Sequence, residues 1–150
     1  MKNIFKLMGL ALIAGSMMFV ACSKDEDNDK IQVTYGEESW STNDMYVMVY
    51  GQEMNATIYA SESDDDPSIT FSCGTTANRY ALTSTYLVSY DKGDGIEHLS
   101  TTEGAITISE IELSNQTMSA NIDCMILDGT EQVPLTVAID NITWKTPSVQ

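Results

Sequence analysis

The residue whose chemistry is easiest to read is Cys22, which follows a segment typical of an export signal. Lys2 and Lys6 precede an apolar run from Leu7 to Val20, and the small residue Ala21 stands directly before the cysteine. A charged start, an apolar centre and a small residue at the end are the parts of a signal peptide. A cysteine at the cleavage point also indicates lipid attachment. The sequence therefore predicts cleavage after residue 21 and lipidation of Cys22.

The apolar run is too short to serve as a membrane anchor itself. About 20 residues are needed to cross a hydrocarbon core of ~30 Å, and no later part of the chain has an apolar run of comparable length. Attachment of the mature chain to a membrane would therefore have to be covalent.

The residues around Cys22 resemble the bacterial lipobox, with Phe19 standing where that pattern usually has leucine. The resemblance implies a diacylglyceryl group on the thiol and an acyl chain on the new amino terminus. Each buried CH₂ contributes ~0.8 kcal/mol, so two or more chains would hold the protein to its membrane on cellular timescales. An ordinary secretory signal whose cleavage site happens to contain a cysteine is the alternative.

Residues 23–30, SKDEDNDK, predict a flexible tether. Four acids in eight positions and no apolar side chain leave nothing to offset the entropy of ordering the backbone. The run also resembles the acidic export signal that follows the lipidated cysteine in surface lipoproteins of the Bacteroidota. That resemblance implies the outer face of the outer membrane, with the periplasmic face as the alternative.

Composition and charge set limits on the remainder of the chain. Of 150 residues, 43% are hydrophobic, which suits a globular domain, and residues 31–150 are long enough for one. The formal net charge is −15, and cleavage after residue 21 would leave 5 basic and 22 acidic residues, or −17. A surface this acidic repels phosphate groups, so nucleic acid is excluded as a partner.

From Ile31 onward the hydrophobic pattern has a period of two, which predicts antiparallel strands with one buried face. Runs of this kind recur every 10–15 residues and give eight or nine strands. We expect one run over 79–91, a phase shift and bulge near Ser109-Glu110, a hairpin at Asp128-Gly129, and a late start or an edge position for the strand that contains Pro134. An antiparallel β-sandwich is the favoured fold, and a calycin-like β-barrel is the alternative.

The segment GAITISEIELSNQTMSANIDCMI and the later PLTVAIDNITW resemble the end of small Bacteroidota lipoprotein domains of unknown function. The resemblance covers roughly residues 68–144. It departs at Ser119-Ala120-Asn121, where those domains tend to have glycine and threonine before an aromatic residue. The resemblance supports a β domain on a lipid anchor and implies no activity.

Cys73 and Cys124 both fall on predicted core-facing positions, 51 residues apart. Outside the cytoplasm they could form a disulfide, which the chain-entropy model values at about 4 kcal/mol for a loop of this size. The alternative is two buried free thiols that pack as small hydrophobic groups. The spacing leaves both open.

Neither a catalytic nor a cofactor site is predicted. His98 is the only histidine, and no nucleophile-elbow motif accompanies Ser100, so the expectation is a surface histidine and a protein that is not an enzyme. A metal site is not expected either. One acidic loop offers a weak calcium candidate, although its spacing is not that of an EF-hand; its carboxylates are Glu62, Asp64, Asp65 and Asp66.

Three aromatic residues have positions that could leave them exposed: Trp40, Tyr59 and Trp144. Rigid aromatic faces can stack on sugar rings or anchor a protein partner. The sequence therefore favours a surface lipoprotein whose β domain binds a glycan or a protein without catalysis. A barrel that encloses a small apolar ligand, a structural or fimbrial-type subunit completed by a partner strand, and a hydrolase are the alternatives.

Overall fold

The computed structural model describes residues 30–61, 63 and 65–147, and this part of the chain consists of strands and turns. Ten antiparallel strands form one sheet in the order β2-β1-β10-β9-β8-β7-β5-β4-β3, and the short β6 pairs with β8. The strands are β1 (Ile31–Tyr35), β2 (Glu38–Thr42), β3 (Met45–Tyr50), β4 (Glu53–Tyr59), β5 (Ser68–Gly74), β6 (Asn78–Ala81), β7 (Val88–Asp91), β8 (Glu97–Glu112), β9 (Thr117–Asp128) and β10 (Glu131–Thr143). The all-β prediction is confirmed.

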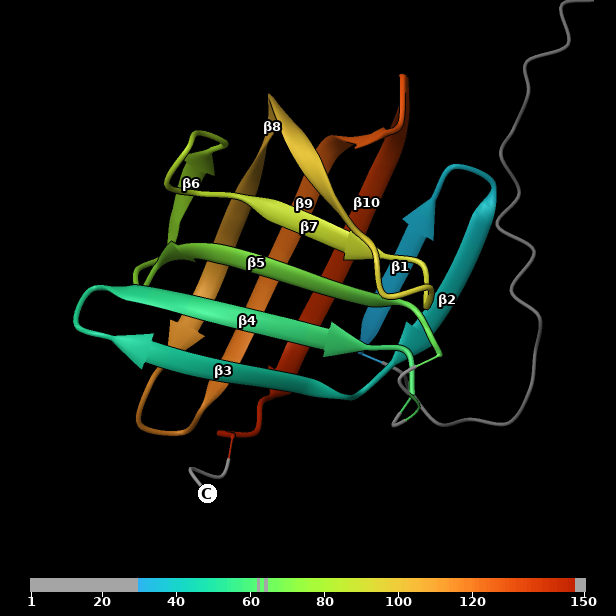
Figure 1. Cartoon of the computed structure of the whole chain (residues 1–150). Coiled ribbons are helices and arrows are strands. Elements are labelled where there is room, and N and C mark those ends of the chain that lie inside the picture. The colour runs from blue at the N-terminus through green and yellow to red at the C-terminus, as the bar shows by residue number, and fades with distance from the viewer. Residues whose placement is uncertain (1–29, 62, 64, 148–150) are drawn as a thin grey trace, which may run out of the picture.

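The long strand β8 turns this sheet from one layer into two. Its first residues, 97–99, pair with β7, whereas the part from Ser100 to Glu112 pairs with β9. β7, β5, β4 and β3 therefore form a front layer, and the strands of the rear layer cross it at a steep angle (Figure 1). The strongly curled sheet encloses one core, which is consistent with a sandwich or a barrel-like fold.

On the side away from β4, the strand β3 is bonded only over a short length, to the segment that follows β10. After β10, the segment that contains Lys145 runs parallel to β3 and forms an isolated bridge with Tyr46. The Lys145 N–H donates to the Met45 carbonyl at 2.8 Å, and the Val47 N–H donates to the Lys145 carbonyl at 2.9 Å. Among the described residues, the remainder of β3 up to Tyr50 has no strand paired with this edge.

Side chains that alternate along the strands fill the space between the layers. Phe71 and Tyr90 are the bulkiest of those that are almost completely buried. The hollows lined by described residues, about 300–410 Å³ each, lie on the surface instead. In β9 the core-facing series is Met118, Ala120, Ile122, Cys124 and Ile126.

Two local predictions are confirmed. The pairing of β8 with β9 shifts register between Ile108 and Glu110, where the change of hydrophobic phase predicts a bulge. β9 ends at Asp128, and Gly129 has a φ of +64° in the turn that leads to β10, as the hairpin signal predicts. Both signals are local, because each depends on a few consecutive residues.

The prediction of one run over 79–91 is wrong. The run is split into β6, which pairs with residues 105–108 of β8, and β7, which pairs with β5 and with the first residues of β8. Between them, the Thr83 hydroxyl accepts hydrogen bonds from the backbone N–H groups of Thr85 and Tyr86, at 3.1 and 3.2 Å. Hydroxyl side chains that bond to nearby backbone in this way favour a turn over a continuing strand.

The expectation for Pro134 is also wrong at the level of the strand, because β10 begins at Glu131 and lies between β1 and β9. The position is nevertheless an edge locally. β1 ends at Tyr35, and the Pro134 carbonyl accepts a hydrogen bond from the Gly36 N–H at 2.9 Å. The Pro134 ring nitrogen points to the same side as this carbonyl, where β1 has already ended. The N–H that proline lacks is therefore not needed by any carbonyl of β1.

Gly104 allows β8 to kink against β9. Its φ of +126° lies outside the range that L side chains favour, and the pairing with β9 shifts register between Ser100 and Gly104. A Cβ added there would lie 2.2 Å from the Asp123 carbonyl oxygen and 2.7 Å from the Cys124 Cα. Both contacts are with backbone, so a side chain at this position would force the two strands apart.

We predict that Gly104→Ala lowers the free energy of unfolding by about 1–3 kcal/mol or more, the usual cost of a strained backbone with the steric clash in addition. Urea unfolding followed by circular dichroism measures this change. Gly95→Ala is the matched control, because Gly95 also has a positive φ, +75°, but open space around its Cβ position. Equal losses in the two variants would contradict the proposed close contact.

Candidate functional site

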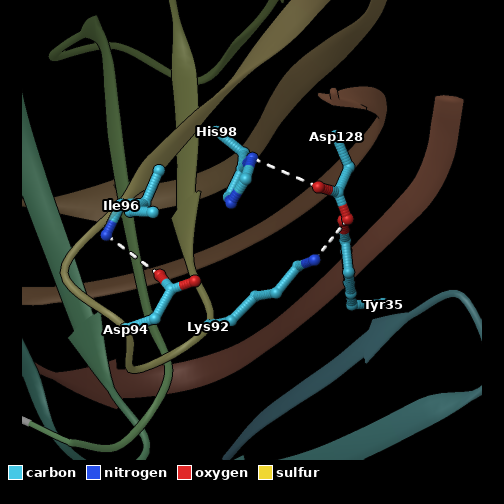
Figure 2. A network of polar contacts seen from close by, with 6 residues as sticks. All are labelled: Tyr35, Lys92, Asp94, Ile96, His98 and Asp128. Atoms are coloured by element: carbon cyan, nitrogen blue, oxygen red, sulfur yellow. Dashed lines mark hydrogen bonds and ion pairs between the residues drawn. The ribbon is translucent and has the colours of Figure 1, made fainter. Parts of the chain in front are cut away.

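A network of polar side chains joins three parts of the chain at one end of the fold (Figure 2). Asp128, at the end of β9, accepts hydrogen bonds from the Tyr35 hydroxyl at 3.1 Å and from the Lys92 ammonium group. His98 Nδ1 lies 3.5 Å from the other oxygen of this carboxylate. The Tyr35 ring stacks on the Tyr90 ring with 4.2 Å between centroids. The network therefore connects β1, the region around β7 and β8, and the β9–β10 turn.

The pKa values in this network move away from neutrality. Hydrogen bonding by Lys92, followed by that of Tyr35, lowers the pKa of Asp128. Burial raises the pKa of Tyr35 to about 12, and its hydrogen bond to Asp128 adds to the effect. The bond to Asp128 raises the pKa of Lys92. At pH 7 these groups are held as a carboxylate, a neutral phenol and an ammonium group.

This arrangement is suited to holding strands together and poorly suited to proton transfer. A general acid or base works best with a pKa near the operating pH, whereas the shifts of Tyr35, Lys92 and Asp128 all run the other way. The expectation of a surface position for His98 is wrong, because its side chain is only 14% exposed. Its Nε2 is buried and has no hydrogen-bond partner among the described residues.

We predict that Asp128→Asn lowers the melting temperature at pH 7, and that the difference from the wild type shrinks as the pH falls. The sign follows from the lowered pKa of Asp128: its stabilisation is complete above the pKa of the unfolded chain, about 3.9. It is then lost as the pH falls through the lower folded-state pKa. Differential scanning calorimetry between pH 7 and pH 2 measures the difference.

Asp140→Asn removes an exposed carboxylate on β10 and is the control for the loss of one negative charge. The difference in melting temperature between Asp140→Asn and the wild type should not shrink as the pH falls. If the difference in melting temperature between Asp128→Asn and the wild type stays constant down to pH 2, the assigned role of the network is wrong.

A second feature is the solvent-facing side of β3 and β4, which gathers aromatic side chains. Tyr46 and Tyr59 pack edge to face with 5.8 Å between ring centroids. Tyr50 is 61% exposed, and its hydroxyl contacts the Met48 sulfur at 3.3 Å. We name these four residues the tyrosine face. Tyrosine and methionine are enriched at protein interfaces.

On the other side of β3, a groove of about 300 Å³ runs along the open edge of this strand. The turn between β8 and β9 forms the opposite wall with Leu113, which is 46% exposed, and Val49 of β3 is 42% exposed. Trp144 lies at the base and is almost completely buried. We name this hollow the edge groove, and its lining residues are Val47, Val49, Leu113, Gln116, Trp144 and Thr146.

The three aromatic residues selected from the sequence lie apart. Trp144 is only 3% exposed, so its selection as an exposed stacking residue is wrong. Trp40 is partly buried against the core. Tyr59 is 38% exposed on the tyrosine face. Tyr46 and Tyr50 were not among the residues selected, although the alternation in the segment MYVMVY, residues 45–50, could have indicated an outward face for both.

Cys73 and Cys124 are both buried and free, which is the second of the two alternatives that the sequence leaves open. Cys73 lies on β5 in the front layer, and Cys124 lies on β9 in the rear layer. Burial raises the pKa of each thiol to about 12. Neither has the exposed thiolate that a reactive cysteine requires.

Two of the four candidate calcium ligands, Glu62 and Asp64, lie outside the described residues, as do Cys22 and the tether up to residue 29. Within the described part of the chain, no three carboxylate, histidine or cysteine side chains lie close enough to hold a metal ion. Asp66 instead accepts a hydrogen bond from the Ser61 hydroxyl. The described part of the chain also has no helix that could span a bilayer.

Comparison with protein-family models, with curated protein sequences and with solved structures returned no match. A function has therefore to be inferred from the residues and the geometry given above.

Proposed function

We propose that this chain is a non-catalytic binding module, anchored to the outer membrane through Cys22 and facing outward, whose β domain binds a protein partner through β3 and its surroundings. One observation carries the proposal. Eight large apolar side chains are exposed in the described part of the chain, and five of them surround β3. These five are Met48, Val49, Tyr50, Tyr59 and Leu113.

Single exposed apolar residues are normal on a protein surface, whereas a group of them indicates a binding site. The group here combines two surfaces of one strand. Tyr50 and Met48 project to the outer side, while Val49 lines the edge groove on the other. Partner residues could therefore contact both sides of β3 at once.

A glycan is the second candidate ligand, because Tyr50 and Tyr59 present exposed rings on the tyrosine face. Aromatic rings of this kind can stack on the apolar faces of sugars. A protein partner is favoured because it also accounts for Val49 and Leu113, which lie on the groove side of β3 and could not contact a glycan stacked on Tyr50.

The expected membrane anchor supports this role. The tether, residues 23–30, would separate an acidic domain from the anionic membrane surface, and the lipid would confine the module to two dimensions. Confinement raises the effective concentration toward any partner in the same membrane, so even a modest affinity would suffice.

We predict that a photo-crosslinking phenylalanine analogue in place of Tyr50 forms a discrete protein adduct in cells that carry the full chain. The same analogue in place of Glu131, an exposed residue at the start of β10, should form none. Mass spectrometry of the adduct identifies the partner, and the purified partner must then bind the wild-type module more tightly than a Met48→Ser, Tyr50→Ser variant. Equal labelling at both positions would contradict a protein-binding role for β3.

We predict that Cys22→Ser abolishes the incorporation of labelled palmitate and moves the protein from the membrane fraction to the soluble fraction. The physical reason is that no other part of the chain is expected to hold a membrane. Protease treatment of intact cells then tests the outward orientation, because a surface module is digested while a periplasmic marker survives. Palmitate on the Cys22→Ser variant would contradict the anchor.

A further inference from the structure

We propose that the open edge of β3 receives an extended, positively charged segment of the partner protein as an added strand. This inference rests on the proposed function and specifies how the partner binds. It begins from the backbone of β3, whose outer edge is paired only at its first residues.

The unpaired groups on this edge follow from the two bonds to Lys145. The Met45 carbonyl and the Val47 N–H point away from β4, since both bond to Lys145. Backbone groups of alternate residues point to the same side of a strand. The Val47 carbonyl and both polar groups of Val49 therefore also point away from β4, at an edge that no described strand covers. An added strand would satisfy all three groups.

Pro147 removes the next backbone bond that the chain's own ladder with β3 would need. In a parallel ladder that continued past Lys145, the next N–H to donate would belong to residue 147 and would bond to the Val47 carbonyl. Proline has no N–H, so this bond cannot form. Among the described residues, the self-pairing ends at Lys145, and the edge of β3 is open from the Val47 carbonyl to Tyr50.

Hydrogen bonds among its lining residues hold the edge groove in place beside this backbone. The Trp144 N–H donates to the Gln116 carbonyl at 2.9 Å, and the Gln116 side-chain amide donates to the Thr146 hydroxyl at 2.8 Å. These bonds fix the far wall relative to β3 before any partner binds. An apolar side chain of the added strand would lie between Val49 and Leu113, over Trp144.

Charge favours a basic partner over a second copy of this chain. Glu53 of β4 is exposed and faces Tyr50 across the pairing of β3 with β4, so the Tyr50 end of the open edge has an exposed carboxylate beside it. The Lys145 ammonium does not offset this carboxylate, because it is paired with Asp44 at 2.5 Å. Two copies of the mature chain, with a formal charge of −17 each, would repel one another at this edge. A strand with lysine or arginine among apolar residues is complementary to it.

The test uses the mature lipidated chain in detergent and three synthetic peptides with blocked ends. The first alternates valine and lysine, the second replaces lysine by glutamate, and the third is the first with a methyl group on every backbone nitrogen, so that neither edge of the peptide can donate. Fluorescence anisotropy should show binding of the first peptide that added salt weakens. The affinities of the other two peptides should be lower than that of the first by roughly tenfold or more. Tight binding of the glutamate or the methylated peptide would overturn the proposal.

Two matched variants locate the binding on the edge. Val49→Pro removes the outward N–H without touching the bonds to β4, whereas Val49→Ala shortens the same side chain and keeps the N–H. The proline variant should bind the lysine peptide about tenfold more weakly than the alanine variant. Equal affinities would overturn the proposal. If Val49→Pro fails to fold, Pro147→Ala decides, because its new N–H can donate to the Val47 carbonyl and should weaken peptide binding; unchanged binding would overturn the proposal.

These outcomes are separate from those of the proposed function. If Tyr50 crosslinks to a partner whose binding is the same for Val49→Pro and Val49→Ala, the protein-binding role stands and strand addition is wrong. Dimers of the wild-type chain in sedimentation that Val49→Pro dissolves would identify a second copy as the occupant and would also overturn the proposal.

Discussion

The structure depends on one constraint, which is that a single strand, β8, belongs to two layers. Because its start pairs with β7 and the rest pairs with β9, the sheet must curl where these pairings change. Gly104 makes the kink possible at the point where a Cβ would collide with β9. The order of the other strands then places β3 next to the segment that follows β10, and the curled sheet encloses one core.

The polar network around Asp128 and the open edge of β3 differ in how completely the neighbouring segments are bonded to one another. Near the β9–β10 turn, Asp128 contacts Tyr35 of β1, Lys92 after β7 and His98 of β8. The Tyr35 ring also stacks on the Tyr90 ring of β7. Along the outer side of β3, two backbone bonds join this strand to the segment after β10. The rest of β3 is an open edge, and five of the eight large apolar side chains that are exposed in the described part of the chain lie beside it.

Much of the fold could be predicted from local patterns. The alternation in β9, the bulge near Ser109-Glu110 and the hairpin at Asp128-Gly129 each depend on consecutive residues, so the sequence contains the information directly. The split of 79–91 could not be read in this way, because the alternation is the same whether the run pairs with one neighbour or two. The expectation for Trp144 failed for a related reason. A register shift between Ile139 and Ile142 reverses the phase of β10 and turns this ring inward.

The candidate site was harder to predict because it is made by topology. His98 and Asp128 are 30 positions apart in the sequence, and the antiparallel register of β8 with β9, in which Ser100 faces Ile126, brings them together. The open edge of β3 is likewise invisible until the strand order is known, because any strand could in principle have a neighbour on both sides. Lipidation at Cys22 and the acidic tether, by contrast, are read from short motifs and remain predictions outside the described residues.

An unpaired strand edge with apolar side chains is normally a hazard, since it can pair with the edge of another copy. In this chain the same composition that made nucleic acid an unsuitable partner also reduces that hazard. A formal charge of −17 on the expected mature chain opposes the approach of a second identical edge, and Glu53 has an exposed carboxylate next to Tyr50 at this edge. A basic strand meets no such barrier. On the proposed strand addition, the acidity of the surface would therefore keep the edge accessible and select by charge what can occupy it.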